Sequence, residues 1–373
     1  MLIVNANALI DGKFVKNACV RFFEGVISEA GTGLLPCAGE QVKDLEGRAL
    51  LPGFVDVHTH ACMGHDTMQG EQAVRSMSRV FAEHGVAAFL PTTMSASAED
   101  TRAALRGIRA VMKAQEPFGA RVCGAHMEAP FISPEKHGAQ AGVHLRAPSK
   151  ELFLSLCDGD PSVVRLITLA PELEGAEELI CYLVSLSVRV SCGHTAATSE
   201  QTRRAVDLGL DHSTHTFNAQ PPLLHRAPGA AGALLTDDRD YCEMIAAGIH
   251  LHPDILKLIF LCKGREKTVA VTDSMEAALM PDGRYALGGQ AVYVKNGEAR
   301  LQDGTLAGSV LTMERAFRNL IAFGFSPEDA AYITTASPAD SAGIRDHGRI
   351  RKGCRAFFTV WDDEWNRTEI ISG

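Results

Sequence analysis

From Pro52 onward the chain alternates short apolar runs with amphipathic stretches, and this alternation restricts its fold more than any other feature. Residues 71–85 illustrate the amphipathic stretches, since Val74, Met77, Val80 and Phe81 recur there at helical spacing. The apolar runs cover residues 54–60, 86–94, 121–130, 163–172, 188–195, 212–217, 241–248 and 267–274. A strand-then-helix pattern repeated eight times predicts an α/β fold, specifically a (β/α)₈ barrel of the TIM type.

The two ends of the chain have a different sequence pattern. Residues 1–51 consist of short alternating runs with turn residues between them, and residues 346–373 are again typical of strands. We therefore predict a small β-sandwich domain built from 1–51 and 346–373, beside a barrel that spans 52–345. Within the barrel segment, residues 283–304 predict a hairpin insertion with Asn296 and Gly297 at its turn, followed by helices near 313–324 and 326–343.

Charge and cysteine usage limit the partners and the compartment. The net charge of −9 argues against nucleic acid as a partner, and it means that an anionic substrate needs a local positive group. No apolar run approaches the roughly 20 residues that span a bilayer, and the N-terminus lacks the basic region of a signal peptide, so no membrane association is expected. The ten cysteines contain no C-x-x-C pair, which favours unpaired thiols and a cytoplasmic location.

Histidines and carboxylates interrupt the apolar runs near their carboxyl ends, which form the catalytic face of a barrel. Such side chains in a converging set bind a divalent ion such as Zn²⁺. His58 and His60 share one side of the first run because side chains alternate along a strand. The complete set is His58, His60, Glu128, His194, His215 (within the sixth run) and Asp273.

A competing interpretation applies to each histidine taken alone, because a histidine near a strand end is often a hydrogen-bonded structural residue. We assign that role, or an exposed one, to His84, His212 (placed just before its strand) and His347. His126 shares a strand face with Glu128, so we predict that it supports a ligand rather than binding the metal. An alternative of a different functional class is a barrel that binds a ligand or regulates another protein without catalysing a reaction.

Several motifs together resemble one enzyme family. They are H-T-H after P-G-F-V-D, "HMEAPFISPEKHGAQ", "GHT", "THTFNAQPPLLHRAPGAAGALL", "VTDSMEAALMPDGRYALGG" and "GTLAGSVLTM". Their order over nearly the whole chain is similar to that of the N-acetylglucosamine-6-phosphate deacetylases, in the amidohydrolase superfamily. The resemblance implies metal-dependent removal of the acetyl group from N-acetyl-D-glucosamine 6-phosphate, giving D-glucosamine 6-phosphate and acetate, in amino-sugar catabolism.

The resemblance also implies a role for each matching residue. Glu128, His194 and His215 match the main metal ligands, His58 and His60 match a pair that holds a second ion in some members, and Asp273 matches the catalytic acid and base. One or two divalent ions per subunit are therefore expected; Zn²⁺ is the first choice, with Fe²⁺, Mn²⁺ or Co²⁺ as alternatives.

Sugar-binding positions follow from the same resemblance. Arg226 matches an arginine that reaches the phosphate of the substrate in the neighbouring subunit, which implies a homodimer. The other matching positions are Ala139, Gln140, Asn218, Ala219, Ala247, His250, Ala307, Gly308 and Ser309. His137 and His250 are the candidates for contact with the carbonyl oxygen during the reaction.

Three residues depart from the family pattern and leave the substrate open. Cys62 and Ala129 replace usual glycines, and Ala247 replaces a usual aspartate. The alternatives are therefore a deacetylase of N-acetylgalactosamine 6-phosphate or another amidohydrolase, such as a D-aminoacylase or a cyclic-amide hydrolase.

Overall fold

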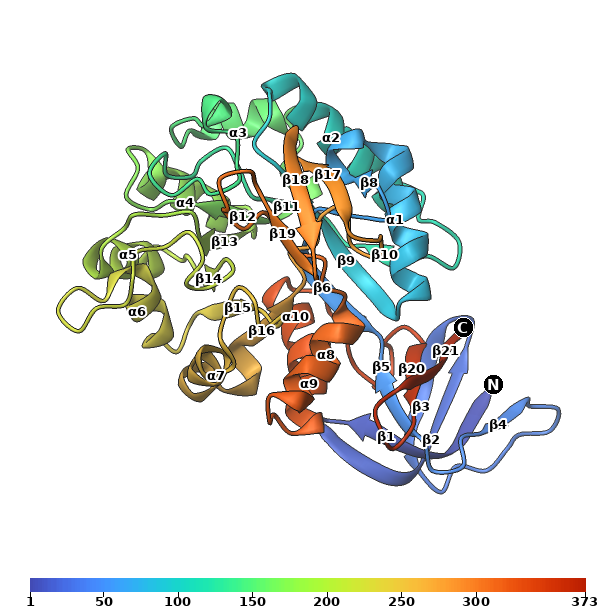
Figure 1. Ribbon diagram of the computed structural model, residues 1–373. Helices are drawn as coiled ribbons and strands as arrows, with labels where there is room; N and C mark the ends of the chain where they lie inside the picture. Colours follow the sequence, from blue (N-terminus) through green and yellow to red (C-terminus); the bar gives the residue numbers. More distant parts are fainter.

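The eight apolar runs form eight neighbouring parallel strands in the computed structural model, which describes residues 1–373 (Figure 1). Their bounds are β6 (Phe54–Thr59), β9 (Val86–Thr93), β11 (Ala125–Met127), β12 (Val164–Leu169), β13 (Arg189–Cys192), β14 (His212–Ser213), β15 (Tyr241–Ile245) and β16 (Thr268–Val271). The short strand β10 (Arg121–Val122) pairs with β9 as well. The predicted α/β barrel is thus confirmed.

The barrel closes between its first and last strands without a regular ladder. The amide of Asp273 donates to the carbonyl of His58 at 2.8 Å, and the hydroxyl of Thr272 donates to the carboxylate of Asp56 at 2.5 Å. Asp56 is 1 % exposed, so the contact with Thr272 gives a buried carboxylate a hydrogen-bond partner beside the backbone bonds of this junction.

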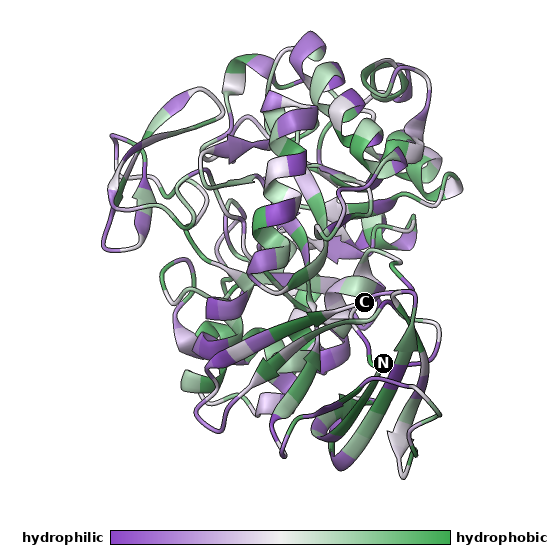
Figure 2. Ribbon diagram, turned by 90° about the vertical axis from the view of Figure 1, so that its right-hand side faces the viewer, coloured by the Kyte–Doolittle hydropathy of each residue, from purple (hydrophilic) through white to green (hydrophobic).

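Helices cover the outside of the barrel (Figure 1). In α1 the predicted stripe of Val74, Met77 and Phe81 is buried, while Val80 packs at its margin. Hydrophilic and hydrophobic residues accordingly alternate along the helices (Figure 2). The helices are α1 (Glu71–Glu83), α2 (Ala98–Lys113), α3 (Lys150–Leu156), α4 (Ala176–Ser185), α5 (Ser199–Asp207), α6 (Gly229–Leu235), α7 (Pro253–Lys267), α8 (Met313–Ala322), α9 (Pro327–Thr334) and α10 (Ala336–Ser341).

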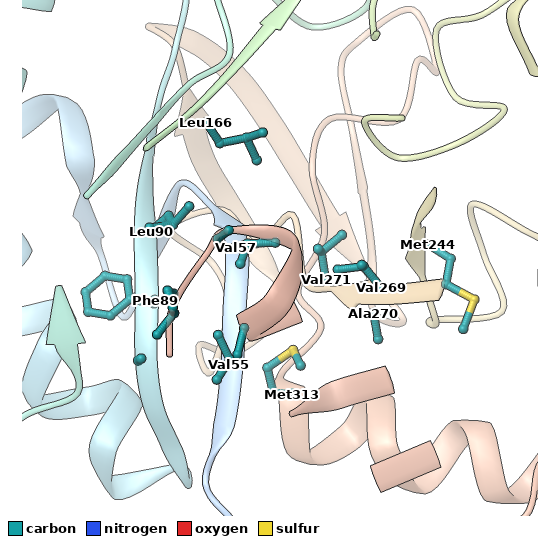
Figure 3. Packing of buried hydrophobic residues seen from close by; sticks show 14 of the residues in the cluster. Val55, Val57, Phe89, Leu90, Leu166, Met244, Val269, Ala270, Val271 and Met313 are labelled. Atoms are coloured by element: carbon teal, nitrogen blue, oxygen red, sulfur yellow. The ribbon is translucent and has the colours of Figure 1, made fainter. Parts of the chain in front are cut away.

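The main hydrophobic core lies in and around the barrel and contains 68 buried residues. Val55 and Val57 of β6 lie near Val271 of β16 and Met313 of α8 (Figure 3). Each fully buried side chain of this size contributes about 1.5–3 kcal/mol relative to an exposed one. None of the helices combines the length and the apolar character that crossing a bilayer requires.

A second sheet joins the two ends of the chain. Its order is β21-β20-β5-β1-β2-β3, with β4 paired to β1. The strands are β1 (Leu2–Ile10), β2 (Lys13–Phe23), β3 (Val26–Thr32), β4 (Val42–Asp44), β5 (Ala49–Pro52), β20 (Phe357–Trp361) and β21 (Arg367–Ser372).

This sheet curls over its own core of 15 buried residues. The rings of Phe22 in β2 and Phe358 in β20 lie 5.8 Å apart, although two strands separate β2 from β20 in the sheet. Flat neighbouring strands are spaced about 4.8 Å apart, so only a curled sheet brings these rings into contact. The domain boundaries at 51/52 and 345/346 stay a prediction.

The insertion after β16 has one strand more than the predicted hairpin. It consists of β17 (Gly283–Leu287), β18 (Gln290–Lys295) and β19 (Glu298–Arg300), all antiparallel. Asn296 and Gly297 occupy the expected turn with φ of 53° and 80°. The remaining short elements are β7 (Ala61–Cys62), β8 (His65–Asp66) and the 3₁₀ helices at Thr67–Gln69, Gly142–His144 and Pro161–Val163.

Candidate active site

The candidate site lies at the carboxyl ends of the barrel strands. Glu128 directly follows β11, and His60 directly follows β6. His194, His215 and Asp273 each come two residues after their strands. Two details differ from expectation: His215 lies beyond its strand, and His212 opens that strand as a fully buried residue. The reason is that only His212 and Ser213 pair with β13 and β15.

Three ring nitrogens converge on one oxygen of Glu128. Its Oε1 lies 3.2 Å from Nε2 of His215 and 3.3 Å from Nε2 of both His194 and His58. The Nε2 atoms of His194 and His215 are 3.1 Å apart.

A second group adjoins the first through the other carboxylate oxygen. Nε2 of His60 lies 3.2 Å from Glu128 Oε2 and 3.2 Å from Asp273 Oδ1, while Nε2 of His58 lies 3.5 Å from Asp273 Oδ1. The structure therefore brings all six predicted side chains into one cluster, with Glu128 between its two halves.

The donor set of this cluster fits a divalent cation. His194 Nδ1 faces the carbonyl of Lys136 at 2.8 Å, and His60 Nδ1 faces the carbonyl of Thr92 at 3.2 Å. Because a carbonyl only accepts, each Nδ1 carries a proton, so Nε2 is the ring nitrogen that can give its lone pair to a cation at the centre. Lone pairs of imidazoles and a carboxylate, directed at one another within the protein, are the ligands that Zn²⁺ and similar ions bind.

Charge in the cluster keeps its carboxylates ionised. Burial disfavours the charged form of Glu128, but when the surrounding imidazoles are protonated, the positive charge of His58 and hydrogen bonds donated by His194 and His215 hold the pKa of its carboxyl well below the usual range. Burial of Asp273 is likewise outweighed by His58 and His60, so the pKa of its carboxyl is lowered. Asp273 is therefore a proton acceptor at neutral pH.

The backbone at the site is held in an uncommon conformation. His194, His215 and Asp273 have φ of 48°, 27° and 49°, in the left-handed region that non-glycine residues seldom adopt. Such strain persists where surrounding contacts enforce it, and it is frequent at functional sites. Next to His194, a side chain on Gly193 would come within 2.5 Å of Thr214, so only glycine fits there.

A cavity of about 320 Å³ opens above the cluster. Six of the predicted sugar-binding residues line it, namely Ala139, Gln140, Asn218, Ala219, His250 and Gly308. Ala247 and Ser309 line a much smaller neighbouring hollow, and Ala307 is fully buried. Arg226 is exposed on the loop before α6 and makes no ion pair within the chain, outside both cavities. Gln140 also donates to Glu128 Oε2 at 2.5 Å.

Three further histidines at or near the site have distinct surroundings. His126 packs edge-on against His58 with ring centroids 4.6 Å apart, and its Nε2 lies 2.7 Å from the hydroxyl of Thr168. Its supporting role stays a prediction. His250 lines the cavity, and burial lowers the pKa of its imidazole. His137 does not line the cavity; its Nδ1 donates a hydrogen bond to the backbone carbonyl of Gln140 at 2.8 Å.

Several residues of the site were not foreseen, and Glu243 and Lys136 are the two that matter most for its charge. Glu243 lies within β15, fully buried, and contacts His58. A charged residue inside the apolar run 241–248 was the available signal. Lys136 is the only lysine or arginine that lines the cavity above the cluster, and its place between Glu128 and Gln140 in the motif HMEAPFISPEKHGAQ was the available signal.

A parallel barrel with histidines and carboxylates gathered at the carboxyl ends of its strands defines a metal-dependent hydrolase. Comparisons with known proteins agree with this class. Residues 49–372 match the Amidohydrolase family. The N-acetylglucosamine-6-phosphate deacetylase of Bacillus subtilis (strain 168) is 37% identical over 358 residues, covering 95% of this chain and 89% of the relative. The N-acetylgalactosamine-6-phosphate deacetylase of Escherichia coli O157:H7 is 36% identical over 324 residues, covering 86% and 85%.

Solved structures show the same architecture. A mutant of N-acetyl-D-glucosamine-6-phosphate deacetylase from Mycobacterium smegmatis, in complex with N-acetyl-D-glucosamine-6-phosphate, matches with a TM-score of 0.92 at 30% identity, covering 100% of this chain and 97% of that one. The N-acetylglucosamine-6-phosphate deacetylase of Thermotoga maritima matches with a TM-score of 0.89 at 34% identity, covering 100% and 98%. This chain belongs to the amidohydrolase family. It is an amide hydrolase that uses a divalent metal ion, as its sequence predicts.

Proposed function

We propose that the protein removes the acetyl group from N-acetyl-D-glucosamine 6-phosphate, producing D-glucosamine 6-phosphate and acetate in amino-sugar catabolism. The observation that carries this proposal is the position of Asp273, ionised and 3.2 Å from His60, across the cluster from Glu128, His194 and His215. A carboxylate beside a cation site at the base of a cavity can supply the proton transfer and the activated water that metal-assisted amide hydrolysis uses. The named deacetylases among the relatives supply the substrate class.

In this proposal Glu128, His194 and His215 hold the main divalent ion, and His58 and His60 hold a second. Imidazole and carboxylate ligands favour Zn²⁺, with Fe²⁺, Mn²⁺ or Co²⁺ as alternatives. When bound, the metal ion would act as a Lewis acid that lowers the pKa of water and polarises an amide carbonyl. All remaining steps depend on side chains of the protein.

Asp273 acts first as a base and then as an acid. Its carboxylate takes a proton from the attacking water, whose oxygen bonds to the acetyl carbon. The protonated Asp273 then gives this proton to the sugar nitrogen as the carbon–nitrogen bond breaks, so the amine leaves neutral. His250, on the wall of the cavity and biased toward the neutral form by burial, is positioned to contact the carbonyl oxygen.

The sugar occupies the cavity lined by Gln140, Asn218 and Ala219, while Ala139, Ala247, Ala307, Gly308 and Ser309 shape its surroundings. Gln140 is engaged by Glu128 and by the amide of Ser95 at 2.6 Å, so its side chain is oriented before substrate binds. We propose that Arg226 contacts the phosphate in the neighbouring subunit of a homodimer, because it is exposed and free of partners within its own chain.

The galactosamine epimer is the second candidate. A deacetylase of N-acetylgalactosamine 6-phosphate is nearly as similar to this chain as the glucosamine enzyme, and Ala247 lacks the polar group usual beside His250. We also propose a cytoplasmic location, which the ten free cysteines favour.

Acetate release from a panel of N-acetylated hexosamines, each with and without the 6-phosphate, tests these proposals, with metal analysis of the same protein. The glucosamine 6-phosphate substrate is expected to have the highest kcat/KM. Preference for the galactosamine epimer would select the second candidate, and equal turnover of unphosphorylated sugars would refute the phosphate requirement.

A further inference from the structure

Glu243 is a buried carboxylate that contacts both halves of the metal cluster. Its side chain, in the middle of β15, is 0% exposed. Oε2 lies 2.9 Å from Nδ1 of His58 and accepts a 2.9 Å hydrogen bond from the backbone amide of His215. Oε2 of Glu243 therefore bonds to His58, which belongs to the His58–His60 pair. The same atom bonds to His215, which belongs to the Glu128–His194–His215 group.

The charge of Glu243 has no structural compensation outside the site. No lysine or arginine forms an ion pair with it, and its Oε1 has no hydrogen-bond partner. A buried carboxylate without a lysine or arginine partner is costly, and an uncharged side chain would fill a barrel strand at lower cost. This carboxylate forms hydrogen bonds only with His58 and with the backbone amide of His215.

The contact with His58 determines which nitrogen faces the centre. A carboxylate accepts the proton of Nδ1, so Nε2, which faces Glu128 and Asp273, is the ring nitrogen available to a metal ion. A carboxylate behind a metal-binding histidine fixes the ring and raises its basicity. At His215 the same oxygen holds the amide of a residue whose φ is 27°, so it helps to maintain that strained backbone.

We infer that Glu243 is a positioning residue that supports both metal positions and couples them. It acts through the ring of His58 at one position and through the backbone of His215 at the other. The inference rests on the proposed function only in requiring that both groups bind divalent ions.

Binding of Co²⁺ to the metal-free protein tests this inference, because the visible absorption of Co²⁺ reports its coordination independently of activity. The variants are Glu243→Gln, which keeps the size, and Glu243→Ala, which removes all contacts. Asp240→Asn is the matched control: Asp240 also has a fully buried carboxyl group, lies three residues from Glu243 and forms no hydrogen bond with any residue of the cluster. Circular dichroism in the presence of a chelator verifies that each variant is folded without metal. If E243A does not fold, E243Q still tests the inference.

We expect two equivalents of Co²⁺ in the parent protein and in D240N. In E243Q the weaker equivalent should bind about 10- to 100-fold less tightly, with a changed absorption spectrum, since the amide is a poorer acceptor for His58. E243A should weaken both equivalents. Unchanged affinities and spectrum in E243Q would overturn the inference, as would a single equivalent in the parent protein. If the parent protein bound no Co²⁺, the proposed function itself would fail.

Discussion

The backbone amide of Asp273 donates a 2.8 Å hydrogen bond to the carbonyl of His58, which joins the last barrel strand to the first at the candidate site. The side chains of the same two residues meet in the cluster, with Nε2 of His58 3.5 Å from Oδ1 of Asp273. Barrel closure therefore sets the distance between the proposed acid–base carboxylate and the histidine pair. A side-chain substitution at Asp273 leaves the backbone bond intact.

Asp273→Asn should remove proton transfer while retaining the metal. An amide of the same shape cannot take a proton from water, so kcat should fall by about 10²- to 10⁴-fold. Glu128, His194 and His215 are unchanged, and the metal content of the purified variant should stay close to that of the parent. Turnover near the parent value would show that another group is the base.

The double variant H58Q/H60N should lower the number of bound ions while preserving part of the activity. Glu128, His194 and His215 contact one another within 3.3 Å without either residue of the pair, so they can retain one ion. Metal analysis and steady-state kinetics on the same preparation measure the outcome. Loss of all metal would mean that the pair anchors the whole site.

Most of the fold and the six clustered side chains could be predicted because their signals are local. Apolar runs mark the strands, and the spacing of His58 and His60 places both on the same side of the chain at the end of β6. Glu243 was missed because its hydrogen bond to His58 spans 185 residues, and only the closed barrel brings them together. The strand β19 is three residues long, too short for an alternating pattern to reveal it. The curl of the terminal sheet likewise depends on contacts such as Phe22 with Phe358, from opposite ends of the chain.

Replacement of Arg226 should affect only phosphorylated substrate. A charge-assisted hydrogen bond contributes about 1.5–3 kcal/mol, so R226A should raise KM for N-acetylglucosamine 6-phosphate about 10- to 100-fold and leave KM for the free sugar unchanged. K136A is the comparison, because Lys136 lines the cavity of its own chain whereas Arg226 does not. A phosphate-selective effect in K136A and none in R226A would contradict the predicted contact across a dimer. Equal effects of R226A on both substrates would remove its phosphate role.

Asp240→Asn should make stability less dependent on pH. Asp240 is fully buried with neither oxygen hydrogen-bonded, and burial raises the pKa of its carboxyl to about 7. In the unfolded chain an aspartate titrates near pH 3.9. Between about pH 4 and 7 the folded protein therefore binds a proton that the unfolded chain has released, and the free energy of unfolding falls as the pH rises.

Each unit of pKa difference corresponds to about 1.4 kcal/mol, so this loss should be on the order of 3 kcal/mol between pH 4.5 and 7. D240N lacks this one titrating carboxyl, so its stability advantage over the parent should grow across this range in urea unfolding measured at matched metal content. D363N serves as the control, because Asp363 is exposed and its replacement leaves the burial of Asp240 unchanged. If D240N and D363N followed the same pH dependence as the parent, the carboxyl of Asp240 would not retain its proton in the folded state.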